Sequence, residues 1–165
     1  MTADEIAIAP ADVNDVPLIL AFIRELAEYE RLASSAVVTA ESLEQSLFGP
    51  MPQAEVVIAR CGDVPAGFAL FFHNYSTFLG RRGLWLEDLF VRPAFRGQGI
   101  GLTLLRHLAT LAVERGCGRF EWAVLDWNEP AIGFYQRLGA IPMSDWTVYR
   151  LTGESLARLA SRADA

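Results

Sequence analysis

The chain has 165 residues, of which 52% are hydrophobic and 21% are charged, and its formal net charge is −6. This composition predicts one folded domain, residues 1–165, and excludes a disordered chain. The acidic balance argues against a nucleic-acid-binding surface, and no apolar run reaches the roughly 20 residues that cross a membrane. The amino-terminal sequence has no apolar signal core, and Cys61 and Cys117 lack metal-type spacing. We therefore expect a cytoplasmic protein with no metal, membrane or nucleic-acid partner.

Two helices are expected among the strands of the first half. Apolar side chains recur at helical spacing from Asp15 to about Leu32, which predicts the first helix. Thr39 is expected to cap a second helix that ends near Phe48. Strands are expected at residues 6–9, 55–60 and 66–72, and a turn containing glycine and proline predicts that the last two form a hairpin.

The second half alternates strands with helices. A helix is expected from Gly99 to Arg115 with Gly116 as its end, and Asn128 is expected to cap a helix that ends at Gly139. Strands are expected at residues 84–91, 120–125 and 146–151, followed by a short helix at 154–162. Hairpins early in the chain and a strand–helix–strand unit in the middle predict an α/β fold on a mixed sheet.

A glycine-rich loop joins the strand at 84–91 to the long helix. It reads Arg96-Gly97-Gln98-Gly99-Ile100-Gly101 and matches neither a Walker A loop nor the dinucleotide-binding fingerprint. Glycines let the backbone approach a ligand closely, and free N–H groups at a helix start, with Arg96 beside them, favour an anion. Tight packing is the alternative explanation, but the position between strand and helix favours phosphate binding.

Two adjacent carboxylates, Glu87 and Asp88, lie within the apolar strand. Successive strand side chains point to opposite faces, so the two do not share a site by direction alone. Burial of either without a partner is costly. One of them is expected to be a base or an amine-binding anion, unless one joins a hydrogen-bond network and the other reaches solvent.

A second strand-to-helix turn carries Asn128 and, seven residues later, Tyr135. Two helical turns separate them, so they share a helix face. The Tyr135 hydroxyl needs a partner if it is buried, and beside the glycine-rich loop it would be placed to protonate a leaving group. The alternative is a tyrosine of the core.

Together these segments resemble the GNAT N-acetyltransferase superfamily. RGQGIG after LEDLFV resembles its acetyl-coenzyme A loop, and NEPAIGFYQRLGA resembles its second motif. ELAEYE, GFALFF and WLEDLFV are similar to the diamine (spermidine/spermine) acetyltransferase family over nearly the whole chain. Residues 75–78 and 117–128 resemble its thialysine acetyltransferase branch, with Ser76 where a polyamine enzyme carries aspartate and Phe78 where tryptophan is common. The resemblance implies a mixed, mostly antiparallel sheet flanked by helices on both faces.

The resemblance also implies a reaction, the transfer of acetyl from acetyl-CoA to a primary amine of a small molecule, which is a thialysine- or lysine-like amino acid or a diamine. It implies that Glu87 is the base, acting through water, that Tyr135 is the acid, and that the enzyme is a homodimer. Tyr29, Glu30 and Glu87 would bind the amine. The residues implied in acetyl-CoA binding are Leu89, Phe90 and Val91 at the strand end, Arg96, Gly97, Gln98, Gly99, Ile100, Gly101 and Leu102 at the pyrophosphate, and Asn128, Glu129, Pro130 and Ala131 at the pantetheine.

Two other functions remain open from the sequence. One is acetylation of a protein or peptide amine, and the other is a non-catalytic acetyl-CoA sensor. The presence of both Glu87 and Tyr135 weighs against the sensor, which needs neither.

Overall fold

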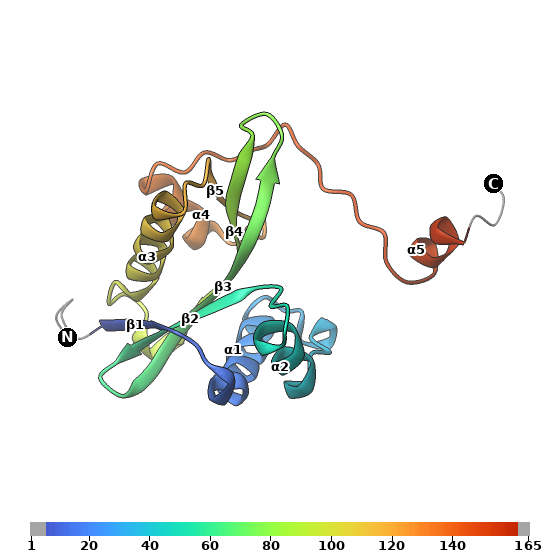
Figure 1. Ribbon diagram of the computed structural model, residues 1–165. Coiled ribbons are helices and arrows are strands. Elements are labelled where there is room, and N and C mark those ends of the chain that lie inside the picture. The colour runs from blue at the N-terminus through green and yellow to red at the C-terminus, as the bar shows by residue number, and fades with distance from the viewer. Residues whose placement is uncertain (1–5, 162–165) are drawn as a thin grey trace. The chain divides into compact units, whose positions relative to one another are not determined.

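The computed structural model describes residues 6–161, and the chain falls into two compact units, Met1–Leu125 and Asp126–Ala165. The expected single domain therefore stays a prediction. Figure 1 labels the elements of both units. The first unit contains β1 (Ile6–Pro10), η2 (Val13–Asp15), α1 (Val16–Tyr29), η3 (Ala33–Ser35), α2 (Ala40–Phe48), β2 (Glu55–Cys61), β3 (Val64–Ser76), β4 (Arg81–Val91), η4 (Pro93–Phe95), α3 (Ile100–Glu114) and β5 (Phe120–Trp122).

The first unit is built on a sheet of five strands in the order β1-β2-β3-β4-β5. The first three pairings are antiparallel, and β4 pairs with β5 in parallel. The β2–β3 hairpin turns at Gly62, whose φ of 57° is the left-handed conformation that glycine adopts without strain. This arrangement confirms the expected mixed, mostly antiparallel sheet.

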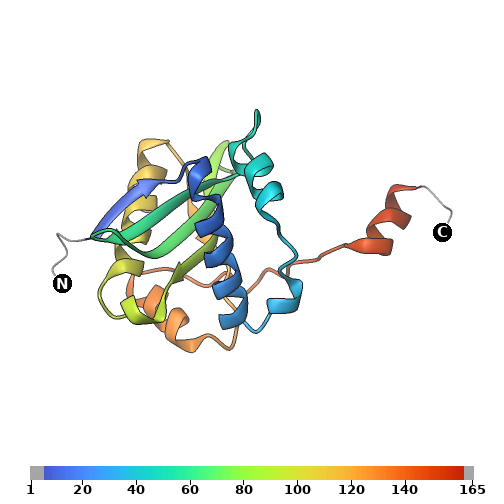
Figure 2. The ribbon, with the colours of Figure 1, turned by 90° about the horizontal axis from the view of Figure 1, so that it is seen from below.

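Helices cover both faces of this sheet (Figures 1 and 2). Phe22 of α1 stacks on Phe68 of β3 at a centroid distance of 5.1 Å and meets the edge of Phe90 at 6.4 Å. On α3, Leu104 and Leu108 are fully buried. Burial of each such side chain stabilises the fold by about 1.5–3 kcal/mol, so these two layers hold the sheet between them.

Local sequence signals set most element ends. Thr39 and Ser42 form the capping box that starts α2, and Gly116, with a φ of 66°, follows the end of α3. The helix α1 ends at Tyr29, earlier than the expected Leu32. The expected buried strand at 120–125 is reduced to the three partly buried residues of β5.

The second unit contains α4 (Glu129–Arg137) and α5 (Gly153–Ala160). Asn128 caps α4 as expected, and its side chain accepts a hydrogen bond from the N–H of Ala131 at 3.4 Å. Gly139 follows the helix with a φ of 86°. The short terminal helix is present, although residue 162 of its expected span lies outside the described residues.

The expected strand at 146–151 is wrong. Among the described residues this segment is neither helix nor strand, and Trp146, Val148 and Tyr149 are 75%, 87% and 93% exposed. A strand needs a neighbour to pair with its backbone, and the described part of the chain supplies none here. Across residues 6–161, no helix has both the length and the apolar character to cross a membrane.

Candidate active site

The second half of β4 has an open side. Among the described strands, β5 pairs only with Leu84, Trp85 and Leu86, whereas β3 stays paired with β4 as far as Val91. From Glu87 to Val91, β4 therefore has no described strand on the side of β5. Backbone N–H and C=O groups that point to an unpaired side are free to bind a ligand. Leu89, Phe90 and Val91, the expected strand-end contacts, lie within this stretch.

A β-bulge lies at Glu87. Leu70 of β3 pairs with Asp88, and the next residue, Phe71, pairs with Leu86, so Glu87 is the extra residue. Bulges redirect side chains and are frequent beside active sites. Glu87 is exposed, and its carboxylate accepts a hydrogen bond from Nε1 of Trp85 at 2.8 Å. The residue expected to act as the base is thus held at the open part of the strand.

Asp88 is half-buried beside two other carboxylates. Burial, and then the charges of Glu87 and Glu30, raise the pKa of Asp88 to about 6. Burial also raises the pKa of Glu30 above its usual value. No described residue donates a hydrogen bond to the Asp88 carboxylate or pairs a positive charge with it. Three carboxylates, Glu30, Glu87 and Asp88, therefore interact between the end of α1 and the open stretch of β4, and such a group favours a bound cation.

The glycine-rich loop begins α3 without a side-chain cap. Gly97 and Gly99 have φ values of 75° and 84°, and the N-cap residue Gly99 leaves the first N–H groups of α3 unsatisfied by any side chain. A Cβ atom added at either glycine would meet nothing within 4 Å. The loop is therefore open and lined by N–H groups at the positive end of a helix, which fits the pyrophosphate of acetyl-CoA.

Two arginines flank the turn between β4 and this loop. Arg92 forms a bidentate ion pair with Glu25 of α1, with its Nη2 atom 2.7 Å from Oε1, and donates to the carbonyl of Pro65. Arg96 donates through Nε to the carbonyl of Val91 at 2.9 Å, and its guanidinium lies 4.7 Å from the centroid of the Tyr29 ring. Sequence reasoning missed the Arg92–Glu25 pair, because no local pattern connects residues 67 positions apart.

The end of α1 presents the two residues expected to bind the amine. Tyr29 is its last residue and is 39% exposed, and Glu30 follows it as the C-cap. The β3–β4 hairpin carries the two residues expected to influence substrate choice. Ser76 is buried and its hydroxyl accepts a hydrogen bond from the N–H of Leu79, whereas Phe78 is 98% exposed.

In the second unit, α4 carries the remaining expected residues. Tyr135 is half-buried, and its ring lies 5.5 Å from that of Phe134. Asn128 has the capping role described above, and Glu129, Pro130 and Ala131 form the first turn of the helix. The second unit thus confirms the expected helix, which Asn128 caps and which contains Tyr135.

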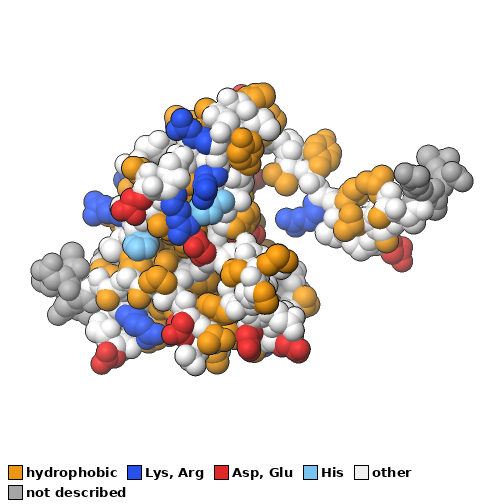
Figure 3. Space-filling model, in the orientation of Figure 1, with side chains coloured by type: hydrophobic (Ala, Val, Ile, Leu, Met, Phe, Trp, Pro, Cys, Tyr) orange, Lys and Arg blue, Asp and Glu red, His pale blue; other side chains and the backbone are white. Residues whose placement is uncertain are grey.

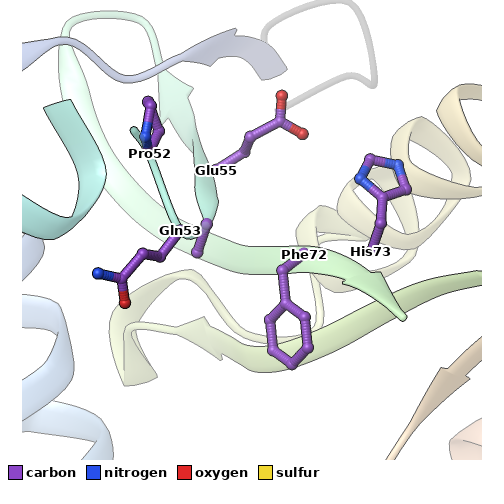
Figure 4. Close-up of a pocket in the computed structure, with 6 residues that line it drawn as sticks. Pro52, Gln53, Glu55, Phe72 and His73 are labelled. Atoms are coloured by element: carbon purple, nitrogen blue, oxygen red, sulfur yellow. The ribbon is translucent and has the colours of Figure 1, made fainter. Parts of the chain in front are cut away.

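A separate pocket of about 230 Å³ lies at the start of β2 and is lined by Pro52, Gln53, Ala54, Glu55, Phe72 and His73 (Figure 4). Nε2 of His73 lies 3.3 Å from Nη1 of Arg115, which also pairs with Glu55. Burial, and then the charges of Arg115 and Arg82, lower the pKa of His73. None of the residues expected at the active site lines this pocket. Within residues 6–161, no group of three or more metal-binding side chains is present.

An open strand edge with a bulge and an uncapped glycine-rich helix start lie on a mixed α/β sheet, which is the fold class that the comparisons can now identify. The model of the Acetyltransferase (GNAT) family matches residues 23–140. The thialysine N-epsilon-acetyltransferase of Sus scrofa is 36% identical over 95% of this chain and 98% of its own length. L-ornithine N5-acetyltransferase NATA1 of Arabidopsis thaliana is 33% identical over 88% of this chain and 84% of its own. The solved structure of an integron cassette protein from the mobile metagenome of V. cholerae has a TM-score of 0.80, at 28% identity over 94% of this chain and 98% of its own.

The chain therefore belongs to the acetyltransferase (GNAT) family, and it is an N-acetyltransferase.

Proposed function

We propose that the protein transfers the acetyl group of acetyl-CoA to a primary amine of a small molecule, a lysine-like amino acid or a diamine. The observation that carries the proposal is the open stretch of β4, which has the Glu87 bulge at one end and the glycine-rich loop at the other. The relatives' names support the substrate class, since they act on thialysine and on ornithine. Both are small amino acids with a side-chain amine.

The loop and the strand edge hold the coenzyme in this proposal. The N–H groups of the loop from Arg96 to Leu102 bind the pyrophosphate, and the first turn of α4, from Asn128 to Ala131, contacts the pantetheine. Bound acetyl-CoA supplies an activated acetyl thioester. Within Leu89, Phe90 and Val91, the backbone N–H groups that face the open side of β4 stabilise the negative charge that develops on the carbonyl oxygen during attack.

The carboxylates prepare the amine. A primary amine has a pKa of about 10 in water, so it arrives protonated and cannot attack. The negative charges of Glu30 and Asp88 favour binding of the ammonium form, and Tyr29 forms part of the pocket wall. Glu87 then accepts one ammonium proton through a water molecule, and Tyr135 donates its hydroxyl proton to the departing sulfur. The second proton that the nitrogen loses as the amide forms restores the Tyr135 hydroxyl. Acetylation removes the positive charge of the product, which weakens its hold on the pocket.

The proposal extends to the whole protein. We propose that residues 1–165 act as one domain, because the family match runs from residue 23 to residue 140 across the boundary between the two units. The two cysteines, Cys61 and Cys117, are free thiols, which supports a cytoplasmic enzyme. Exposed apolar side chains after α4 support a homodimer, in which they would be buried against a second copy of the chain.

An amine panel tests the proposed reaction. Acetyl-CoA is mixed with the protein and with thialysine, lysine, ornithine, a diamine, spermidine or a lysine-containing peptide, and free thiol is measured. We expect thiol release with the small amino acids or the diamine and little with the peptide. Release with the peptide alone would indicate a protein acetyltransferase, and tight acetyl-CoA binding without release would indicate a sensor.

Replacement of Tyr135 by phenylalanine provides the matched variant. Loss of a general acid lowers turnover by about 10²–10⁴-fold, so we expect kcat to fall in Tyr135→Phe while acetyl-CoA binding, measured by calorimetry, changes little. Equal loss of turnover and of acetyl-CoA binding would show that the tyrosine is structural and would contradict its role as the acid.

A further inference from the structure

Two arginines connect the turn before the glycine-rich loop to two aromatic rings of α1. The guanidinium of Arg92 lies 4.6 Å from the centroid of Phe22, and that of Arg96 lies 4.7 Å from the centroid of Tyr29. Phe22 and Tyr29 are seven residues apart, two helical turns, so they lie on the same side of the helix. The segment that leads into the loop is thus held to α1 at two points.

The two contacts differ in kind. Arg92 is bound to the Glu25 carboxylate by three hydrogen bonds, and its aromatic partner, Phe22, is fully buried. Charge pairing and burial make this contact part of the folded core. Arg96 is exposed, has no carboxylate partner among residues 6–161, and lies closest to a ring that is 39% exposed, with the buried Phe90 ring farther away at 5.7 Å. Its contact is therefore the weaker one and is more easily changed by a ligand.

The position of Arg96 links both proposed ligand sites. Its backbone begins the loop proposed to bind the pyrophosphate, and its Nε atom holds the carbonyl of Val91, the last residue of the open strand stretch. Its guanidinium covers Tyr29, next to Glu30, at the proposed amine side. A planar guanidinium can stack on a ring and donate a directed hydrogen bond at the same time, which a lysine ammonium cannot do.

We propose that Arg96 is a positioning residue that couples coenzyme binding at the loop to the placement of Tyr29 and Glu30 at the amine site. The inference deepens the proposed function and rests on it. A ligand held by the loop backbone restrains the Arg96 side chain that already lies over Tyr29, and the end of α1 is restrained with it. Because coupling is reciprocal, bound amine also strengthens coenzyme binding by the same factor.

A double-mutant cycle on the two KM values tests the coupling. Arg96→Ala and Tyr29→Leu are each expected to raise the KM for the amine about tenfold, and the double variant is expected to raise it no further. In a Tyr29→Phe background, which keeps the ring, Arg96→Ala is expected to retain its effect. Arg96→Lys is expected to rescue only part of the loss.

Two outcomes of the cycle would overturn the proposal. One is an effect of Arg96→Ala on the KM for acetyl-CoA with the KM for the amine unchanged, which would mean that the side chain binds only the coenzyme. The other is full additivity of Arg96→Ala and Tyr29→Leu. Arg92→Ala is the comparison for a merely structural contact, and we expect it to lower the unfolding temperature without a selective change in either KM.

Hydrogen–deuterium exchange gives a readout that needs no turnover. Addition of acetyl-CoA is expected to slow exchange of the amides of residues 26–31 in the unmodified protein, and to slow it much less in Arg96→Ala. If the unmodified protein acetylates no amine but shows this protection, the proposed function fails and the coupling stands. If acetyl-CoA binds without protecting residues 26–31, or does not bind, the coupling is refuted.

Discussion

The side chains of Glu87 and Asp88 show how one inserted residue changes what strand alternation predicts. Alternation alone separates the two carboxylates onto opposite faces but does not say which one meets the ligand. The bulge makes Glu87 the unpaired residue and leaves Asp88 in register with Leu70. No local pattern in LEDLFV predicts the bulge, because the bulge exists only in the pairing of β4 with β3. The raised pKa of Asp88 was equally out of reach, since it depends first on burial in the folded protein and then on the charges of Glu87 and Glu30.

The unpaired Asp88 carboxylate is expected to destabilise the fold at neutral pH. The pKa of Asp88 is about 6 in the folded protein, whereas the usual value for an aspartate is 3.8. The folded state therefore binds the proton more tightly than the unfolded state does. Stability then falls as the pH rises from about 4 through 6. We predict that Asp88→Asn raises the free energy of unfolding by about 1–3 kcal/mol near pH 8, and that the gain shrinks towards zero near pH 4, as measured by urea unfolding.

Glu87→Gln is the control for this prediction. Glu87 is exposed, and a glutamine keeps an acceptor for Nε1 of Trp85, so stability is expected to change by less than about 0.5 kcal/mol. A gain in Asp88→Asn that is the same at both pH values would contradict the link to titration of Asp88. Asp88→Asn is also expected to weaken amine binding, which would explain why position 88 has an unpaired carboxylate.

At the scale of elements, the sequence predicted what local chemistry determines. The caps at Thr39 and Asn128 and the glycines after α3 and α4 act within a few residues, and the structure confirms them. Strands depend on distant partners instead. The segment 146–151 has a strand-like composition but no described neighbour, and the strand expected at 120–125 stops at Trp122, where β4 and β5 cease to pair. That separation also creates the open side of β4, so the site's main feature was not predictable from either strand alone.

The glycines of the loop are expected to respond oppositely to alanine. Gly99 has a left-handed φ of 84°, which costs a residue with a Cβ about 1–2 kcal/mol. Gly101 is helical, and its added Cβ would meet only Cγ2 of Val91 at 3.9 Å, an ordinary contact. Alanine is favoured over glycine in a helix by about 0.5–1 kcal/mol. We predict that Gly99→Ala lowers the unfolding temperature and weakens acetyl-CoA binding, whereas Gly101→Ala raises the unfolding temperature.

Differential scanning fluorimetry with and without acetyl-CoA measures both effects. The increase in unfolding temperature caused by acetyl-CoA should shrink for Gly99→Ala, because the loop backbone is displaced. An unfolding temperature for Gly99→Ala equal to that of the unmodified protein would show that the left-handed conformation is not required.

For the whole molecule, the basic residues have one property that bears on its proposed activity. All 14 of the residues counted as Lys or Arg are arginine, so the chain has no lysine. An arginine guanidinium stays protonated near neutral pH and is not a nucleophile for acetyl transfer. Thiol released in the amine panel therefore reports on the added amine, because the enzyme offers no lysine side chain as a competing acceptor.

The carboxy-terminal tail, residues 141–160, has more exposed apolar surface than a monomer usually leaves in water. Figure 3 shows hydrophobic side chains on the surface of the segment that bears α5. The tail's exposed large apolar residues are Ile141, Met143, Trp146, Val148, Tyr149, Leu151, Leu156 and Leu159. Aromatic side chains such as Trp146 and Tyr149 each bury roughly 150–250 Å² when they are covered, and a stable interface buries roughly 800 Å² per partner.

We predict a homodimer held by this tail. Sedimentation at micromolar concentration is expected to give twice the mass of one chain, and the state should persist at high salt, because burial of apolar surface rather than ion pairing drives association. Trp146→Ser combined with Tyr149→Ser removes two large exposed rings and should give a monomer. Thr147→Ser, which lies between them and keeps a hydroxyl, should remain dimeric. A monomeric unmodified protein would refute the dimer. If the unmodified protein is a dimer and the double variant is a dimer too, the interface lies elsewhere, because aromatic anchors usually contribute a large part of such an association.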